Sequence, residues 1–384
     1  MLLAIPLAWL QLARERVRLF VALAGIGFAV ILMMMQLGFQ EALFTAAVNF
    51  HVNLKTDIVL ISPQTTTLFA IKNFSRRRLY QAAGVDGVES VSPLYLDFGL
   101  WRNPQTRKTR QLMIIGFDPS QAVFSLPGVA DYLDRIKMPD VVLFDENSRP
   151  EYGAIAEQFK AGKTVSTEVS GRKITVGGLF QLGASFSADG NLITSDLNLL
   201  RLFPERNLGL IDIGLINVIP GKDISAVIAE LKTLLPDDVL VLSKQGFVRF
   251  ERNYWETSTT IGFIFTLGTL MGFIVGMVIV YQILYTDVSD HLAEYATLKA
   301  MGYKSRFLYT VVLQEAFILA VLGFIPGFAL CLGLYKLVRE GTSLPMLMTA
   351  DRVITVFLLT LIMCIVSGVI AMRRVQAADP ADIF

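Results

Sequence analysis

Charged residues are scarce in this chain of 384 residues. They make up 17% of the sequence, while hydrophobic residues make up 53%. Soluble domains carry about a quarter charged residues, so this composition favours a membrane protein. The formal net charge is only +1, which leaves no excess of basic residues to bind a nucleic-acid backbone. We therefore expect no nucleic-acid partner.

Cysteine and histidine are also scarce, with two residues of each. Cys331 and Cys364 both lie inside apolar runs, which excludes a disulfide framework. His51 and His291 lie far apart in sequence, and neither has a cysteine nearby, so we expect no metal site. We interpret His51 as a solvated surface residue, with contact to anionic lipid or a partner as the alternative.

Long apolar runs are what the sequence does contain. Crossing a bilayer takes about 20 residues in a helix, and four stretches qualify: residues 19–39, 257–286, 307–335 and 353–372. The first run is too long for a signal peptide and no cleavage site follows it, so we interpret it as a retained anchor. We expect residues 1–18, apolar and then basic, to form an interfacial helix with Trp9 at the headgroup level.

The basic residues beside these spans set the orientation of the chain. More of them flank the side that holds both termini, which places the termini in the cytoplasm by the positive-inside rule. Residues 287–306 and the tail, 373–384, would then be cytoplasmic. Residues 40–256 and a short loop, 336–352, would lie on the other side of the membrane.

The segment 40–256 is expected to fold as an α+β domain. We predict strands at residues 57–62, 112–117 and 238–243, and helices at residues 75–84 and 223–235. Ser75 is the expected N-cap of the first helix and Gly84 its C-terminal stop. Because helices and strands alternate at both ends, the two halves of the domain would flank an insertion. That insertion, about residues 138–215, is expected to be β-rich and to form a separate lobe.

One fragment of a nucleotide-binding motif occurs in this segment. Residues 161–166, AGKTVS, contain the Gly-Lys-Thr end of a phosphate-binding loop. The pattern needs a second glycine five residues before Gly162, where Glu157 stands, and a carboxylate there would repel phosphate. We interpret the fragment as a surface turn.

Acidic residues near His291 give no catalytic group either. Asp287 and Asp290 resemble acids that orient a base, but no nucleophile accompanies them. We expect both carboxylates to cap the helix that follows, because the helix dipole favours negative charge at its N-terminus. The sequence therefore predicts no catalytic residues.

Glu315 lies just inside the third span, where an ionised group costs about 3 kcal/mol. We expect it to pair with Lys304 or Arg306 near the interface. A proton or substrate role is the alternative.

Glycine and proline predict where the spans pack and bend. Residues Gly268, Gly272 and Gly276 recur every fourth position, so they line one helix face and indicate a helix–helix seam within the protomer or across a dimer. In the third span Gly323, Pro326 and Gly327 predict a kink, because proline removes one backbone hydrogen bond.

A short amphipathic helix is predicted between the second and third spans. Asp290 supplies a start signal, Lys299 stands in its last turn and Gly302 follows as the C-terminal stop. Its apolar residues form two strips, Leu292 with Tyr295 and Ala296, and Leu298 with Met301. We expect neither strip to be buried. The helix would rest on lipid or dock a cytoplasmic partner in helix-in-groove fashion.

At these residues the chain resembles a known family. The order of one span, a large outer domain and three further spans is similar to the FtsX/MacB/LolC class of ABC-transporter permeases. The coupling-helix signature of that class resembles EYATLKAMGYKSRFL (294–308), and its closing segment resembles RRVQAADPADIF (373–384). The blocks WLQLARER, DIVLISPQTT, FSRRRLYQA and ESVSPLY are similar to the DevC type, the cyanobacterial permease associated with heterocyst glycolipid export.

The resemblance implies a four-helix membrane protein of the bacterial inner membrane with a MacB-like α+β domain in the periplasm. It implies a non-catalytic permease, a homodimer, whose separate cytoplasmic ABC ATPase holds the ATP and Mg. The outer domain would engage a membrane-fusion adaptor that feeds a TolC-like channel in the outer membrane. The implied ATPase-coupling residues are Asp290, His291, Leu292, Glu294, Tyr295, Leu298, Lys299, Met301 and Gly302.

Two other functions remain open at this point. One is an FtsX-like subunit that signals across the membrane to a periplasmic enzyme, which the large outer domain disfavours. The other is a membrane-embedded hydrolase, which the absence of paired catalytic groups in the spans disfavours. The transported substrate cannot be inferred from the sequence.

Overall fold

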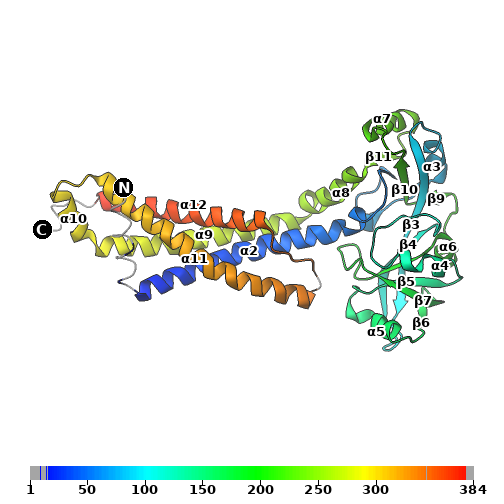
Figure 1. Cartoon of the computed structure of the whole chain (residues 1–384), viewed down its shortest axis with the longest axis horizontal. Helices are drawn as coiled ribbons and strands as arrows, with labels where there is room; N and C mark the ends of the chain where they lie inside the picture. Colours follow the sequence, from blue (N-terminus) through cyan, green and yellow to red (C-terminus); the bar gives the residue numbers. More distant parts are fainter. Residues whose placement is uncertain (1–8, 10–13, 15, 343, 378–384) are drawn as a thin grey trace. The chain divides into compact units, whose positions relative to one another are not determined.

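The computed structural model describes residues 9, 14, 16–342 and 344–377 (Figure 1). It divides into two compact units. The first holds Met1–Ala42, Thr260–Thr342 and Met346–Phe384, and the second holds Leu43–Thr259 and Ser343–Pro345. The interfacial helix expected at residues 1–18 lies largely outside the described residues, and the Asp-Pro-Ala segment of the tail lies outside them entirely.

Four long helices make up the first unit, and each is long and apolar enough to cross a membrane. They are α2 (Arg16–Val52), α9 (Thr260–Asp290), α11 (Ser305–Thr342) and α12 (Ala350–Ala377). A short helix, α10 (Leu292–Ala300), follows α9 at one end of this group (Figure 1). Helix α2 has 37 residues, and at about 1.5 Å per residue it extends well beyond the roughly 30 Å of hydrocarbon. It continues without a break into the second unit.

The tandem glycines of α9 lie against α2 of the same chain. A Cβ atom added at Gly268 would stand 2.5 Å from the Gln36 side chain, and one at Gly276 would stand 2.6 Å from the Cβ atom of Ala29. Gly272 faces α2 between these two positions. The seam indicated by the sequence therefore joins the first and second spans within one protomer.

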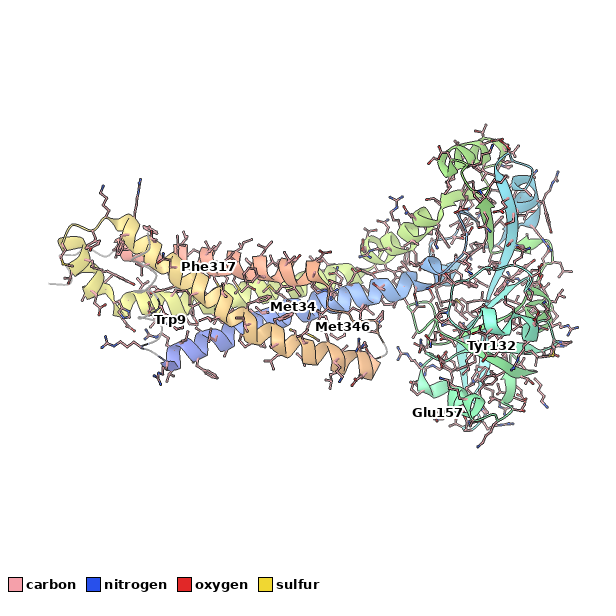
Figure 2. The ribbon with its side chains drawn as sticks, viewed as in Figure 1. Trp9, Met34, Tyr132, Glu157, Phe317 and Met346 are labelled. Carbon is pink, nitrogen blue, oxygen red and sulfur yellow. The ribbon has the colours of Figure 1, made fainter. Side chains whose placement is uncertain are left out.

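The glycines of α11 also face α2. A Cβ atom at Gly327 would lie 2.9 Å from the Gly27 carbonyl oxygen, and one at Gly323 would lie 2.6 Å from the Ile26 side chain. Pro326 lies inside α11, which runs through it without interruption. These glycines let the two backbones approach closely. Met34 of α2 is fully buried, whereas Phe317 of α11 is exposed (Figure 2).

The second unit is built on a nine-stranded sheet in the order β11-β1-β10-β3-β4-β8-β5-β7-β6. The strands are β1 (Ile58–Ile61), β3 (Val88–Arg102), β4 (Thr109–Phe117), β5 (Val141–Asp145), β6 (Ser166–Val169), β7 (Arg172–Phe180), β8 (Asn191–Ser195), β10 (Ile213–Val218) and β11 (Leu240–Ser243). A separate two-stranded sheet joins β2 (Phe74–Ser75) to β9 (Leu210–Ile211). The helices are α3 (Arg76–Ala82), α4 (Leu133–Ile136), α5 (Ile155–Lys160), α6 (Asp196–Leu202), α7 (Ile224–Leu234) and α8 (Lys244–Asn253).

One half of the sheet consists of two β-α-β units, β1-α3-β3 and β10-α7-β11, in the antiparallel order β11-β1-β10-β3. This is the split arrangement of ferredoxin-like folds. Strand β1 is buried on both faces. Its residues Ile58 and Leu60 pack in the hydrophobic cluster that includes α3 and α7, while Val59 and Ile61 pack in the one that includes the end of α2 and α8.

The other half contains the strands of the insertion. Strand β4 pairs in parallel with β8, and β5 pairs in parallel with β7. A single pairing of Trp101 on β3 with Val169 on β6 closes a ring of strands through β4, β8, β5 and β7. The strands within residues 138–215 thus extend the same sheet, so the separate lobe expected there is not seen.

Helix ends in this unit follow their sequence signals only in part. Asp223 caps α7 by accepting a hydrogen bond from the Ser225 N–H, and Ser243 caps α8 through the Gly246 N–H. Ser75 stands at the expected N-cap of α3, but its hydroxyl accepts no capping hydrogen bond. Gly84 follows the helix without the positive φ expected of a glycine stop.

The packing of α9 against α2 can be tested by filling the seam. We expect Gly276→Leu to cost about 1–3 kcal/mol, because the added side chain must displace Ala29 and Met363 in a packed helix contact. The readout is the thermal midpoint of the full-length protein in detergent. Gly333→Leu on α11 is the matched control, because a Cβ atom there meets nothing within 4 Å. Equal midpoints for the two variants would contradict the seam.

Candidate functional site

The corner between α9 and α11 contains the residues predicted to couple an ATPase. Helix α9 runs through Asp290, and α10 follows at Leu292. Gly302 has a φ of +93°, and the Tyr303 N–H donates to the Leu298 carbonyl oxygen at 3.1 Å. Together these form a Schellman stop at the end of α10, as the glycine signal predicts. The prediction that Asp290 caps α10 is wrong, because α9 continues through it.

The short helix α10 has one anchored face and one open face. Tyr295 is 2% exposed and packs with Val288, Leu308, Val312 and Met372 from three long helices, and Leu298 contacts the same cluster. Met301 is 64% exposed, and Glu294 is also exposed. The expectation that both apolar strips stay unburied is therefore wrong for Tyr295, because the ends of α9, α11 and α12 cover it. The side chain of Lys299 lies outside the described residues.

Charged groups from three elements meet beside α10. The Arg18 Nη2 atom donates to the Asp290 Oδ2 atom at 2.6 Å, and its Nη1 atom lies 3.7 Å from the Asp287 Oδ1 atom. The His291 Nδ1 atom lies 2.9 Å from the Asp287 carbonyl oxygen. Asp287 and Asp290 therefore bind side chains of α2 and their own turn instead of capping α10.

Glu315 of α11 is fully buried and faces this group. Its carboxyl group lies near that of Asp287. Lys304 and Arg306 are both exposed, and neither oxygen of Glu315 accepts a hydrogen bond from a described donor. The predicted pairing with Lys304 or Arg306 is thus wrong.

A second buried polar group lies in the outer unit, where α2 ends and α8 leads toward α9. Glu251 of α8 is fully buried. Its Oε1 atom accepts hydrogen bonds from the Thr67 hydroxyl and the Trp255 Nε1–H, both at 2.8 Å, and its Oε2 atom accepts one from the Leu68 N–H at 2.8 Å. Burial raises the pKa of the Glu251 carboxyl, and these three hydrogen bonds oppose part of that rise.

His51 belongs to the same buried group. Its side chain is fully buried, it packs against the rings of Phe50 and Phe247, and its Nε2 atom lies 3.6 Å from the Glu251 Oε2 atom. The prediction that His51 is solvated is wrong, because the last turn of α2 lies inside the second hydrophobic cluster of the outer unit. Thus the end of α2 packs against α8 through the rings of His51 and Phe247, and the imidazole makes no hydrogen bond to the Glu251 carboxyl.

Beyond Glu251 the backbone of this connection changes conformation. Residues 254–258 form a π-helical turn, and Thr259 is extended, with φ −118° and ψ 158°. Helix α9 begins at the next residue. The chain thus enters the outer unit along an unbroken helix and leaves it through an interrupted one.

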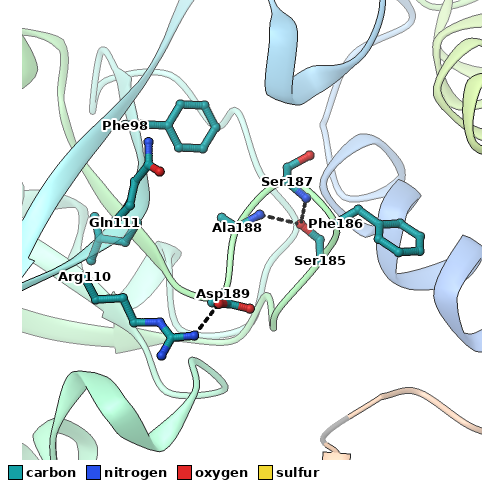
Figure 3. Close-up of a pocket in the computed structure, with 9 residues that line it drawn as sticks. Phe98, Arg110, Gln111, Ser185, Phe186, Ser187, Ala188 and Asp189 are labelled. Carbon is teal, nitrogen blue, oxygen red and sulfur yellow. Dashed lines mark hydrogen bonds and ion pairs between the residues drawn. The ribbon is translucent and has the colours of Figure 1, made fainter.

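The ring of Trp255 in this turn stacks on Phe186 at 4.3 Å, and the loop that carries Phe186 lines an open pocket of about 230 Å³ (Figure 3). Arg110 donates to Asp189 at 2.5 Å across this pocket, and Arg149 binds the same carboxylate at 2.7 Å. Two guanidinium groups therefore hold the Asp189 carboxylate in place beside this pocket.

Another open pocket, of about 520 Å³, lies beside the glycine-lysine-threonine turn. Gly162 has a φ of +75°, and Lys163 and Thr164 line the pocket. Glu157 lies on α5 just before this turn (Figure 2). Among the described residues, no group of three metal-ligating side chains is present.

Comparison with known proteins gives one family match. Residues 254–380 match the FtsX-like permease C-terminal family. This segment contains α9, α10, α11 and all of α12, so the α10 corner lies in the part of the chain that is similar to FtsX-like permeases. Among curated proteins, none matches this chain.

Three solved structures are similar to about half of the chain. The periplasmic region of MacB from Actinobacillus actinomycetemcomitans is 12% identical, with a TM-score of 0.37, covering 54% of this chain and 98% of that one. The extracellular domain of the noncanonical ABC-type transporter YknZ from Gram-positive bacteria is 15% identical, with a TM-score of 0.34, covering 49% and 100%. A domain of a permease protein from Porphyromonas gingivalis is 14% identical, with a TM-score of 0.30, covering 50% and 89%.

The buried group around Glu251 predicts a measurable stability change. In Glu251→Gln the amide oxygen can still accept from Thr67 and Trp255, but the amide NH₂ then faces the Leu68 N–H. We expect a loss of about 1–3 kcal/mol, because a buried donor is left without an acceptor. The readout is urea unfolding of the full-length protein, followed by tryptophan fluorescence.

Glu256→Gln is the matched control for this variant. Glu256 is exposed and pairs with the half-buried Arg252 at 2.7 Å. A surface pair of this kind contributes about 0–1 kcal/mol. A Glu251→Gln variant as stable as this control would show that Glu251 does not hold α8 in place.

Proposed function

We propose that this chain is the permease subunit of an ATP-driven exporter, and that α10 is the contact for a separate cytoplasmic ABC ATPase. The two-sided structure of α10 within the FtsX-like permease domain carries the proposal. A docking helix must present a free face to its partner and be fixed to the helices that it moves. Met301 and Tyr303, in the turn directly after α10 and 64% and 47% exposed, provide the free surface, and Tyr295 provides the fixed face.

In this mechanism ATP and Mg bind the partner, and dimerisation of the ATPase displaces α10. The buried Tyr295 cluster passes the displacement to the ends of α9, α11 and α12. Two connections lead from these helices to the outer unit. Helix α2 is continuous, whereas the link from α9 to α8 contains the extended residue Thr259. The link between α8 and α9 can therefore bend, while α2 keeps its length.

The outer unit would receive this motion at the buried group of His51 and Glu251. His51 at the end of α2 packs against Phe247 of α8, so a change at either connection acts on the same edge of the sheet. The permease thus works as a mechanical transmitter in the bacterial inner membrane, with residues 40–256 in the periplasm. Substrate need not pass between its spans.

The finer features of the proposal rest on the sequence blocks. The similarity of WLQLARER and FSRRRLYQA to the DevC type supports a homodimeric exporter of a glycolipid or another amphipathic molecule. A membrane-fusion adaptor and an outer-membrane channel would complete the pathway. Lipid profiling of a deletion strain tests this directly. Loss of one amphipathic molecule from the outer membrane would support export, whereas loss of a periplasmic enzyme activity alone would point to FtsX-like signalling.

The ATPase contact is tested by placing a charge on the exposed turn that follows α10. We expect Met301→Asp to reduce the amount of ABC ATPase that co-purifies with the full-length protein from native membranes by tenfold or more, because an apolar contact of about 1.4 kcal/mol or more is lost. Mass spectrometry quantifies the ATPase. Leu298→Asp is less decisive, because Leu298 also packs in the Tyr295 cluster.

Met138→Asp is the matched control for this experiment. Met138 is 51% exposed in the outer unit, so it receives the same change in a different unit of the protein. Co-purification should persist in this variant. An ATPase that is retained equally by both variants would argue against α10 as its contact.

A further inference from the structure

The pocket of about 520 Å³ beside the glycine-lysine-threonine turn lies within the outer unit. Its volume falls in the range of cavities that hold small organic ligands. Every side chain from residue 43 to residue 259 is described, so all groups of this unit that can face the pocket are known. Two of them are basic, Arg135 and Lys163, and among the described lining residues none is acidic.

A β-bulge in β7 forms one side of this pocket. In the pairing of β5 with β7 the register shifts at Gly177, between the paired residues Val176 and Gly178. Gly177 is therefore the extra residue of the bulge, and such a residue is left out of the ladder of hydrogen bonds. Its carbonyl oxygen instead accepts a hydrogen bond from the Arg135 Nη1 atom at 2.8 Å. The bulge thus fixes a guanidinium group at the edge of the pocket.

An aromatic ring also holds Arg135. The Cζ atom of Arg135 lies 5.1 Å from the centroid of the Tyr132 ring (Figure 2). Tyr132 packs directly on Gly178, where an added Cβ atom would overlap the ring. A carbonyl oxygen and the face of a ring both attract a cation, but neither carries a full negative charge. Arg135 is therefore held in place with its charge uncompensated.

Lys163 supplies the second positive charge from the turn after α5. It is exposed, and neither Lys163 nor Arg135 forms an ion pair with any residue of the described outer unit. The acidic residues close to Arg135 in sequence already bind other basic residues, in the pairs Asp134–Lys137 and Asp140–Arg172, each at 2.6 Å. Thr164 lines the pocket next to Lys163, and its hydroxyl can donate to the same anion.

Much of the remaining lining is apolar. Val141 and Val176 are buried, Phe159 is half-buried, and Met138 is 51% exposed. A purely ionic ligand would leave these side chains in contact with water, whereas a purely apolar ligand would leave the two cations without a partner. The combination favours a ligand that carries both an anionic and an apolar group.

We propose that this pocket binds a small amphipathic anion, in which a phosphate, sulfate or carboxylate group is joined to a single apolar chain. Arg135, Lys163 and Thr164 bind the anionic group, and the apolar chain covers Phe159 and Met138. Because Arg135 is already oriented by Gly177 and Tyr132, little side-chain freedom is lost there on binding. The site depends on the outer unit alone, so it stands whether or not α10 contacts an ATPase.

The experiment titrates the full-length protein in nonionic detergent with hexyl phosphate, inorganic phosphate and hexanol, followed by saturation-transfer NMR. We expect hexyl phosphate to bind about tenfold or more tightly than either of the other two compounds, because it alone contacts both the cations and the apolar wall. Equal affinity for inorganic phosphate would show an adventitious ion site. Equal affinity for hexanol would show that the cations take no part. Either result would overturn the proposal.

Lys163→Gln places the probe in the pocket. Loss of this charge should weaken hexyl phosphate binding about tenfold, which corresponds to about 1.4 kcal/mol, whereas Lys163→Arg should retain the wild-type affinity. Arg135→Gln should weaken binding to a similar extent, and its thermal midpoint shows whether the outer unit stays folded.

Lys108→Gln is the matched control, because Lys108 is an exposed lysine of the same unit that does not line the pocket. It should bind hexyl phosphate as the wild-type chain does. Wild-type affinity in Lys163→Gln, or an equal loss in Lys108→Gln, would contradict the site. No residue of α10 lines the pocket, so Lys163→Gln tests this site and Met301→Asp tests the ATPase contact separately.

Discussion

Close approach of glycine-bearing helices to α2 is the constraint on which the membrane unit depends. Lipid tails are as apolar as leucine, so helices in a bilayer associate through tight packing more than through the hydrophobic effect. Gly276 of α9 and Gly327 of α11 bring these helices against the same turn of α2, near Ala29 and Gly27. Larger side chains there would hold the helices apart. The position of α2 among the other spans therefore depends on a few glycines, which have no side chain to hold the helices apart.

Much of this arrangement could be read from the sequence, because it is encoded in local patterns. The apolar runs predicted four spans, the tandem glycines predicted a seam, and Gly302 predicted the end of α10. In the outer unit, strand β1 at Ile58–Ile61 and helix α7 at Ile224–Leu234 fall within the predicted ranges. Each of these features depends on residues that are neighbours along the chain or on one helix face.

The features that the sequence did not reveal arise from residues far apart in the chain. The sequence predicted a solvated His51, because nothing near it along the chain indicated that Phe247 and Glu251 would cover it. Tyr295 looked exposed because its cover comes from three other helices. The sequence favoured pairing of Glu315 with Lys304 or Arg306, at or just before the start of α11, but both are exposed and Glu315 faces Asp287 instead. Burial of a polar residue by tertiary contacts leaves no local pattern to recognise.

Hydrogen bonds at two places fix the position of α2 along its own axis. Glycine packing alone would allow α2 to shift along the neighbouring helices. At one, the Tyr335 hydroxyl of α11 donates to the Met34 carbonyl oxygen at 2.6 Å. At the other, Arg18 binds Asp290 at the end of α9. A displacement of the α10 corner must therefore break the Arg18 contact or carry α2 with it. Because α2 continues unbroken to Val52, a displacement that keeps this contact moves its far end as well.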